Sequence, residues 1–268
     1  MRRLAGEPVD GLFDFRTTTS FASEYIDTYY RDKPPTNDER RVFEFLVRYT
    51  RELPRQTLML EVGCGPTVHH VLPFVRLVDE IHVADYLAEN LSEIDKWKTG
   101  APDACGWHHY SELVLELEGH PRRPRDVAAL EALAKFKVTR LLTCDLTQHH
   151  VLGRDEWYPR VSAFYCTEEI GISLARWEEV MANLARVVAP SGRLLLACLA
   201  DTDFYRVGDS SYPCARVTAR DMERVLPDLG FDMNATVIES SSVEGQGDEG
   251  VVGVVLVAAT KKPVRGWA

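Results

Sequence analysis

The sequence predicts an α/β protein with a mostly parallel β-sheet that is covered by helices on both faces. Seven short apolar runs alternate along most of the chain with segments of helical periodicity. The runs are almost continuously apolar, which is typical of strands buried on both faces. The last two runs are joined by SVEGQGDEG, a stretch rich in glycine and acid in which no helix fits. We therefore expect a terminal hairpin whose final strand is antiparallel to the sheet.

Each element follows from the local pattern. Residues 1–50 contain no strong strand, and helical spacing predicts helices over 20–32 and 37–53, the second with Asn37 as its N-cap. The expected strands are 57–63, 80–86, 138–146, 161–167, 192–200, 233–242 and 251–261. The expected helices between them are Thr67–Val78, Ala88–Lys98, Ala128–Lys137, Leu174–Val188 and Ala219–Leu229, and residues 99–127 resemble an insertion.

Composition limits the class of protein. The chain has 268 residues, no internal repeat and no break in composition, so we expect one compact unit. Its formal net charge of −10 argues against binding to nucleic acid or to an anionic membrane. It weakly favours a cationic small-molecule ligand. The apolar run VVGVVLVAA is too short to span a membrane, and MRRLAG is not expected to begin a signal peptide.

Cysteine and histidine patterns predict neither a metal site nor a disulfide framework. The six cysteines are scattered without a Cys-x-x-Cys pair, which suggests a reducing, cytoplasmic location. Six of the eight histidines occur as adjacent pairs, whose side chains point apart in a regular element. We expect these histidines to be surface or core residues.

The stretch TLMLEVGCGPTVHHVLPFV, Thr57–Val75, predicts a cofactor site. Gly63 and Gly65 follow an expected strand and permit a tight turn and a close approach by a ligand. The amides that begin the next expected helix would face that ligand. The second strand ends at Asp85, where a carboxylate can accept both hydroxyls of a ribose.

The details of the turn favour S-adenosylmethionine as the cofactor. Val68 stands where a dinucleotide fingerprint has its third glycine, and Pro66 lacks an amide that could bind a pyrophosphate. The Gly-Lys-Ser/Thr of a P-loop is absent. S-adenosylmethionine has no phosphate and needs only the turn and the acid. Asp145, at the end of the third strand, could bind the adenine amino group or could instead cap a turn.

Several segments resemble one family of methyltransferases. They are LEVGCGPTVHHVLPFV, IHVADYLAENLSEIDKW, CDLTQHHVLG, SAFYCTEEIG and LADTDFYRVGDSSYPCARVT, and the likeness extends from about Phe21 to Thr260. The family is that of nicotinamide, phenylethanolamine and indolethylamine N-methyltransferases. The resemblance implies a Rossmann-like sheet of seven strands, a monomer, and an N-terminal helical lid (1–50) on a methyltransferase domain (51–268).

The resemblance also implies the cofactor contacts. These would be Tyr25 and Tyr30 from the lid, Gly63, Gly65 and Thr67 from the turn, Asp85, Tyr86 and Asn90 around the ribose, and Asp145 and Leu146 beside adenine. We also expect Cys64, Tyr165 and Cys166 to border the cofactor. For the two lid tyrosines, the alternative is the buried face of an amphipathic helix.

The acceptor end of the site is expected at CTEEIG. Members of the family that methylate amines or pyridines carry one acid here, which matches Glu168, followed by a small residue, where this chain has Glu169. One carboxylate is enough for a primary amine, whereas two could grip a guanidinium and leave its third nitrogen to attack. Glu169 could instead be a solvated acid at a helix N-terminus. Tyr205 and Asp203 would orient the acceptor, although Asp201 and Asp203 could also cap turns.

Three functions are compatible with these features. The first is an S-adenosylmethionine-dependent N-methyltransferase of specialised metabolism, acting on a guanidine such as L-arginine or, alternatively, on an aliphatic or aryl amine or a pyridine. Its catalytic residues would be Glu168, Glu169, Tyr205 and Asp203. The second is a non-catalytic protein that binds the cofactor and regulates a partner. The third, a nicotinamide-dependent oxidoreductase, is disfavoured by Pro66 and Val68.

Overall fold

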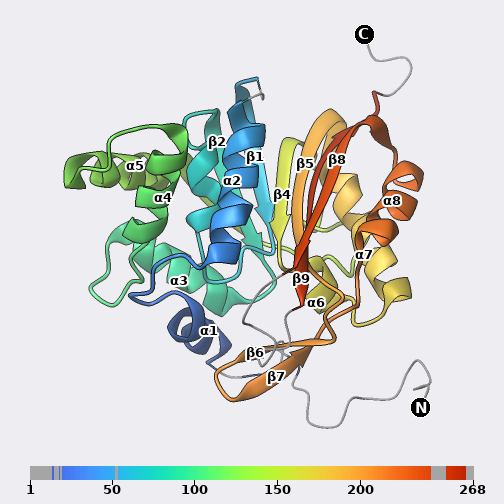
Figure 1. The fold of residues 1–268 in the computed structure, drawn as a ribbon, viewed down its shortest axis with the longest axis horizontal. Helices are drawn as coiled ribbons and strands as arrows, with labels where there is room; N and C mark the ends of the chain where they lie inside the picture. Colours follow the sequence, from blue (N-terminus) through green and yellow to red (C-terminus); the bar gives the residue numbers. More distant parts are fainter. Residues whose placement is uncertain (1–13, 15–17, 19, 52–53, 243–251, 264–268) are drawn as a thin grey trace.

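The computed structural model describes Asp14, Thr18 and residues 20–51, 54–242 and 252–263 (Figure 1). Its helices are α1 (Phe21–Tyr29), α2 (Asn37–Arg51), the 3-10 helix η1 (His69–Phe74), α3 (Ala88–Thr99), α4 (His108–Glu118), α5 (Pro124–Lys137), α6 (Thr167–Ile170), α7 (Leu174–Val187) and α8 (Ala219–Asp228). Its strands are β1 (Gln56–Val62), β2 (Val78–Asp85), β3 (Val138–Thr143), β4 (Tyr158–Phe164), β5 (Val188–Ala200), β6 (Phe204–Val207), β7 (Ser210–Pro213), β8 (Phe231–Ser242) and β9 (Gly253–Lys261). No helix among the described residues is long and apolar enough to cross a membrane.

Seven strands form one sheet in the order β3-β2-β1-β4-β5-β9-β8. The pairs from β3 to β5 are parallel, and β9 runs antiparallel to both of its neighbours. The predicted α/β class and the antiparallel final strand are therefore confirmed. The loop predicted to join the last two strands falls largely at 243–251, outside the described residues. The chain order changes direction between β1 and β4, where open sheets bind their ligands beyond the carboxyl ends of the strands.

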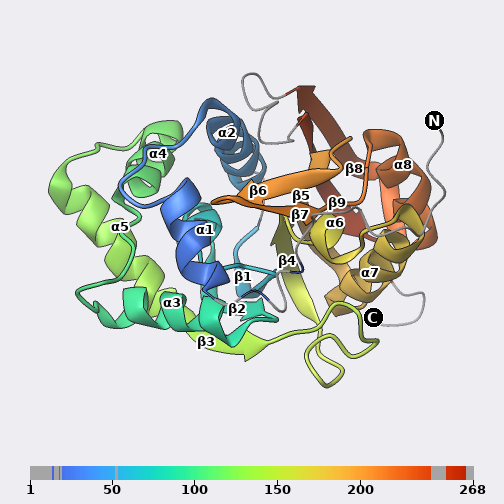
Figure 2. The same ribbon diagram turned by 90° about the horizontal axis from the view of Figure 1, so that it is seen from below.

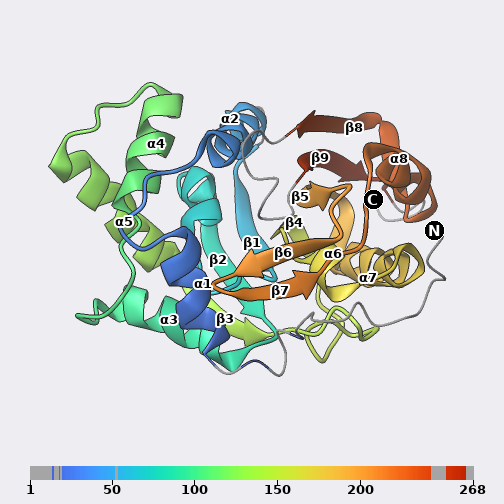
Figure 3. The ribbon, with the colours of Figure 1, turned by 60° about the horizontal axis from the view of Figure 1, so that its bottom comes forward.

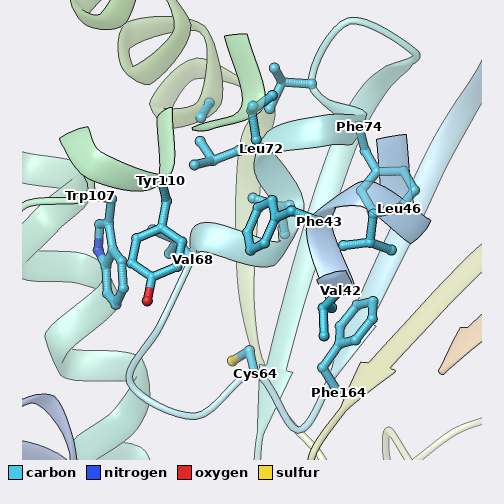
Figure 4. Close-up of a cluster of buried hydrophobic side chains, with 14 of the residues drawn as sticks. Val42, Phe43, Leu46, Cys64, Val68, Leu72, Phe74, Trp107, Tyr110 and Phe164 are labelled. Carbon is cyan, nitrogen blue, oxygen red and sulfur yellow. The ribbon is translucent and has the colours of Figure 1, made fainter. Parts of the chain in front are cut away.

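Both faces of the sheet are buried, as the apolar runs predict. Met59 and Leu195 lie in the core with side chains of α2, η1 and α4. Their neighbours Leu60 and Leu196 point to the other face and lie in the core with α7 and α8. Figure 1 shows these two helices together on one side of the sheet. Figure 4 shows part of the first cluster, to which α2, η1 and α4 all contribute.

The helix predicted over Thr67–Val78 is wrong in type and length. The chain forms only the short 3-10 helix η1, and Val78 already begins β2. Pro73 lies inside this segment and has no amide to donate, which opposes a continuous α-helix. The bonds that remain are of the 3-10 kind, such as that from the Leu77 amide to the Phe74 carbonyl at 2.8 Å.

Two other local predictions need correction. The N-cap of α2 is Thr36 rather than Asn37, because the Thr36 hydroxyl accepts the Glu39 amide at 3.3 Å and the Glu39 carboxylate accepts the Thr36 amide at 2.6 Å. The segment 99–127 contains α4 and the start of α5, which begins at Pro124. Proline is favoured in the first turn because the amides there have no helical partner.

The hairpin of β6 and β7 is absent from the predicted elements. It forms a separate two-stranded sheet, and Figures 2 and 3 show it lying across one end of the main sheet beside α1. The Gly208 amide donates to the Thr28 hydroxyl at 2.9 Å, and the Tyr29 hydroxyl donates to the Arg206 carbonyl. Helix α1 and the hairpin are therefore joined above the carboxyl ends of the strands.

Candidate active site

The glycine turn after β1 is held tightly by the protein. Gly63 has φ +65°, and a Cβ atom there would lie 2.6 Å from both Cβ and Sγ of Cys166. The amides of Gly63 and Cys64 both donate to the Ala84 carbonyl, at 2.8 and 3.1 Å. The Thr67 hydroxyl donates to the Cys64 carbonyl at 2.8 Å. The first amides of the turn therefore bind β2. The prediction that amides at the start of the next helix face the ligand concerns later residues and stays a prediction.

Asp85 connects the turn to α3. Its Oδ2 accepts the Gly65 amide at 2.8 Å, and its Oδ1 accepts the Leu87 amide at 2.8 Å and the Asn90 side-chain amide at 2.9 Å. Burial raises the pKa of Asp85, and these hydrogen bonds oppose that rise. A carboxylate has about four acceptor positions, so Asp85 retains capacity for a ligand hydroxyl.

The residues around Asp85 fit an adenosyl cofactor. Asn90 is buried, and its Oδ1 has no hydrogen-bond partner. A buried acceptor without a partner is costly, and a ribose hydroxyl would supply the missing donor. A Cβ atom at Gly65 would meet nothing within 4 Å, so the turn borders open space there. Tyr86, which follows Asp85 in the chain, is 46% exposed.

At the predicted adenine end, Asp145 caps a turn. Its Oδ1 accepts both the amide and the hydroxyl of Thr147, at 2.8 and 2.6 Å. This is the alternative that the sequence left open for Asp145, and its contact with adenine stays a prediction. Leu146 is buried, and its carbonyl accepts the side-chain amide of Asn183 at 2.9 Å.

Tyr25 and Tyr30, the two tyrosines expected in the lid, have different surroundings. Tyr30 is buried, with its ring centroid 4.8 Å from that of His69 and 5.3 Å from that of Trp107, so it belongs to the core behind the turn. Tyr25 is partly buried, and its pKa is raised first by burial and then by the negative charge of Glu169. Tyr25 therefore faces the acceptor end.

Glu168 is directed into the protein. Its side chain is 0% exposed, its Oε1 accepts the Leu199 amide at 2.7 Å, and its Oε2 accepts the Thr167 hydroxyl at 3.3 Å. Burial raises the pKa of Glu168 to about 7, against the opposing effect of these hydrogen bonds. Glu168 thus links α6 to β5, and neither of its oxygens is exposed.

Glu169 lies where α1, α6 and the hairpin meet. It is partly buried, and burial, followed by the charge of Glu168, raises its pKa well above the ordinary value. The Tyr205 hydroxyl lies near enough to lower that pKa, although it has no partner at hydrogen-bond distance and Tyr205 is only 3% exposed. The charge of Glu169 in turn raises the pKa of the buried Cys214 thiol, after burial itself.

The other predicted residues lie around this centre. Cys64 and Cys166 are buried beside the turn, and Tyr165 has a strained backbone with φ +52°. Asp201 and Asp203 are exposed and share Arg216, whose Nη2 lies 2.5 Å from Asp201 and whose Nε lies 3.7 Å from Asp203. Asp203 therefore lies at the rim of the site, where Arg216 offsets its charge.

The sequence did not predict two groups that lie next to the acids of the site. They are the Leu199 amide, which binds Glu168, and Cys214, which faces Glu169. The alternation of the segment 204–214 could have predicted the hairpin that positions Cys214. Nothing in the sequence identifies a particular backbone amide as the partner of Glu168.

Comparison with known proteins confirms the resemblance. The model of the NNMT/PNMT/TEMT family matches residues 15–262. Indolethylamine N-methyltransferase of Oryctolagus cuniculus is 26% identical, over 90% of this chain and 92% of its own. Nicotinamide N-methyltransferase of Homo sapiens is 24% identical, over 87% and 90%. Phenylethanolamine N-methyltransferase of Homo sapiens is 27% identical, over 79% and 76%.

Solved structures support the fold. Magnesium protoporphyrin IX methyltransferase from Synechocystis PCC 6803 with bound SAM superposes with a TM-score of 0.54 at 16% identity, over 92% of this chain and 93% of its own. The chain therefore belongs to the NNMT/PNMT/TEMT family of S-adenosylmethionine-dependent N-methyltransferases.

Proposed function

We propose that the acceptor is a small amine that binds as a cation against Glu169. The observation that carries this proposal is the surroundings of that carboxyl group. Among the described residues, the groups that shift its pKa are acids and a tyrosine, with no base. A partly buried acid without a basic neighbour is stabilised by a cationic ligand. The related enzymes named for indolethylamine and phenylethanolamine support an amine.

An amine suits this geometry better than the guanidine predicted from the sequence. A guanidinium fork needs two carboxylates that converge on it. Glu168 is buried and already uses its oxygens on Leu199 and Thr167, whereas Glu169 is only partly buried. A single carboxylate is sufficient for an ammonium ion. L-arginine would also bring a carboxylate, which the acids at this end would repel.

The proposed reaction assigns a role to each residue. The cofactor supplies a methyl group on a sulfonium, which is already a good electrophile. Glu169 takes one proton from the ammonium and leaves a neutral nitrogen lone pair to attack in line. A carboxylate with a raised pKa is a better base than an ordinary one. Glu168 acts as a positioning residue for α6, while Tyr205 and Tyr25 orient the acceptor.

An acceptor panel tests this proposal. The protein would be incubated with S-adenosylmethionine and amines, guanidines or pyridines, and methylated products would be measured by mass spectrometry. We expect methylated amines, and we expect Glu169→Gln to lower turnover by about 10²–10⁴-fold while S-adenosylhomocysteine still binds. Glu179→Gln, at an exposed site on α7, is the matched control. Methylation of guanidines or pyridines without amines would contradict the proposal, as would full turnover in Glu169→Gln.

A further inference from the structure

Glu169 occupies an environment in which a charge needs compensation. The titratable groups that face it come from five parts of the fold. They are Tyr25 on α1, Asp85 at the end of β2, Cys166 and Glu168 at the start of α6, Tyr205 on β6, and Cys214 after β7. All of these groups are neutral or acidic. In the described part of the chain, only a proton or a bound cation can therefore offset the charge of Glu169.

The same carboxyl group lies close to the cofactor site. The packing of Gly63 against Cys166 brings the start of α6 onto the glycine turn. The charge of Asp85, the proposed ribose ligand, also acts on Glu169. The Tyr205 hydroxyl is buried without a partner beside Glu169, so it could donate to the carboxylate once that group is charged.

We propose that Glu169 carries a proton in the ligand-free protein and releases it to solvent when a positively charged ligand enters the cleft. The O–H bond of the carboxyl group breaks, the proton goes to the buffer, and the cation takes its place as counter-charge. The sulfonium of S-adenosylmethionine would bind with this release, whereas the neutral thioether of S-adenosylhomocysteine would bind without it. The inference rests on the proposed function, because Glu169 is the acid at the acceptor end.

This coupling would prepare the enzyme for its reaction. Binding of the charged cofactor would leave Glu169 ionised and ready to take a proton from the acceptor. Methyl transfer would move the positive charge from sulfur to the acceptor nitrogen, while Glu169 keeps the proton that it took from the ammonium. The neutral S-adenosylhomocysteine would then lie beside a neutral carboxyl group, which needs no counter-charge from the cofactor. The protonation state of Glu169 would thus differ between the complex with S-adenosylmethionine and the complex with S-adenosylhomocysteine.

Titration calorimetry tests the proposal without any acceptor. S-adenosylmethionine and S-adenosylhomocysteine would each be titrated near neutral pH in two buffers with different ionisation enthalpies. We expect S-adenosylmethionine to release about one more proton than S-adenosylhomocysteine. Its affinity should also rise with pH by up to about tenfold per unit, while the affinity of S-adenosylhomocysteine changes less. Equal proton release by the two ligands would overturn the proposal.

Variants identify the group responsible. Glu169→Gln resembles the protonated acid and should abolish the difference in proton release, whereas Glu179→Gln should retain it. Binding of S-adenosylhomocysteine reports whether each variant is folded, and Glu169→Ala provides a second test. A difference that persists in Glu169→Gln, or that disappears only in Glu168→Gln, would overturn the assignment. Calorimetry uses the cofactor without an acceptor. A negative result there would contradict the proton release, whereas a negative result in the acceptor panel would contradict the proposed function.

Discussion

Gly63 and Gly65 show how two similar positions in one turn carry different constraints. Both have left-handed backbone angles, φ +65° and +59°. Only Gly63 also faces a close neighbour, Cys166, whereas the position of a Cβ atom at Gly65 is open. A substitution at Gly63 therefore meets backbone strain and overpacking together, and a substitution at Gly65 meets strain alone.

We predict that Gly63→Ala lowers the free energy of unfolding by roughly 3 kcal/mol, as the sum of backbone strain and overpacking. Gly65→Ala should cost about 1 kcal/mol. Urea denaturation of the ligand-free protein measures both values. Gly100→Ala is the control, because Gly100 has φ +76° and open space at the end of α3. Equal costs at Gly63 and Gly65 would show that the contact with Cys166 is unimportant.

The site residues differ in how far the sequence can predict them. Gly63 and Asp85 lie at the ends of adjacent parallel strands, so a local pattern is enough to bring them together. The surroundings of Glu169 come from α1, α6 and the hairpin, and their convergence depends on the tertiary fold. A sequence pattern also cannot show that Glu168 turns inward to a backbone amide while its neighbour Glu169 stays partly exposed.

At the scale of single elements, the start of α2 distinguishes two adjacent polar residues. Thr36 exchanges two hydrogen bonds with Glu39, and Asn37 is the first helical residue. We predict that Thr36→Ala lowers the free energy of unfolding by about 1 kcal/mol, the usual cost of losing an N-cap. Asn37→Ala should cost much less in the same denaturation experiment. The reverse order would restore Asn37 as the cap.

The elements that were predicted correctly have strong periodic signals. Helix α7 ends one residue before its expected end, and the expected strands are all present, although β5 begins at Val188 rather than at residue 192. The elements that were missed or mistaken are short or interrupted. Pro73 breaks the helical pattern of η1, and β6 and β7 have only four residues each. The hairpin is stabilised by tertiary contacts with α1, such as Phe21 on Tyr212 at 5.2 Å between ring centroids.

At the scale of the whole molecule, the topology explains why acids from separate strands meet at the glycine turn. The order β3-β2-β1-β4-β5 places the carboxyl ends of β2 and β4 on either side of β1. Asp85 and the Glu168–Glu169 pair therefore flank the glycine turn from opposite directions. This arrangement lowers the free energy of unfolding, because buried acids with raised pKa values destabilise the folded protein once they ionise.

That cost predicts a pH dependence of stability. Burial raises the pKa of Glu168 to about 7, whereas a glutamate in an unfolded chain titrates near 4.3. At pH values between these two pKa values, the folded protein binds more protons than the unfolded chain. The contribution of Glu168 to stability is therefore present at low pH and is lost as the pH rises to about 7. The loss amounts to about 3 kcal/mol for the ligand-free protein. Glu168→Gln cannot ionise and keeps an oxygen for the Leu199 amide, so its stability relative to wild type should improve as the pH rises.

Urea denaturation of wild type and Glu168→Gln at intervals between pH 5 and 8 measures this difference. Removing the charge of Glu168 also relieves Glu169, which changes the difference in the same direction. Glu179→Gln should follow the wild-type curve, since Glu179 is an exposed residue paired with Arg176. Parallel curves for wild type and Glu168→Gln would mean that Glu168 does not titrate in this range. The raised pKa, and with it the balance of charge proposed for the cleft, would then have to be abandoned.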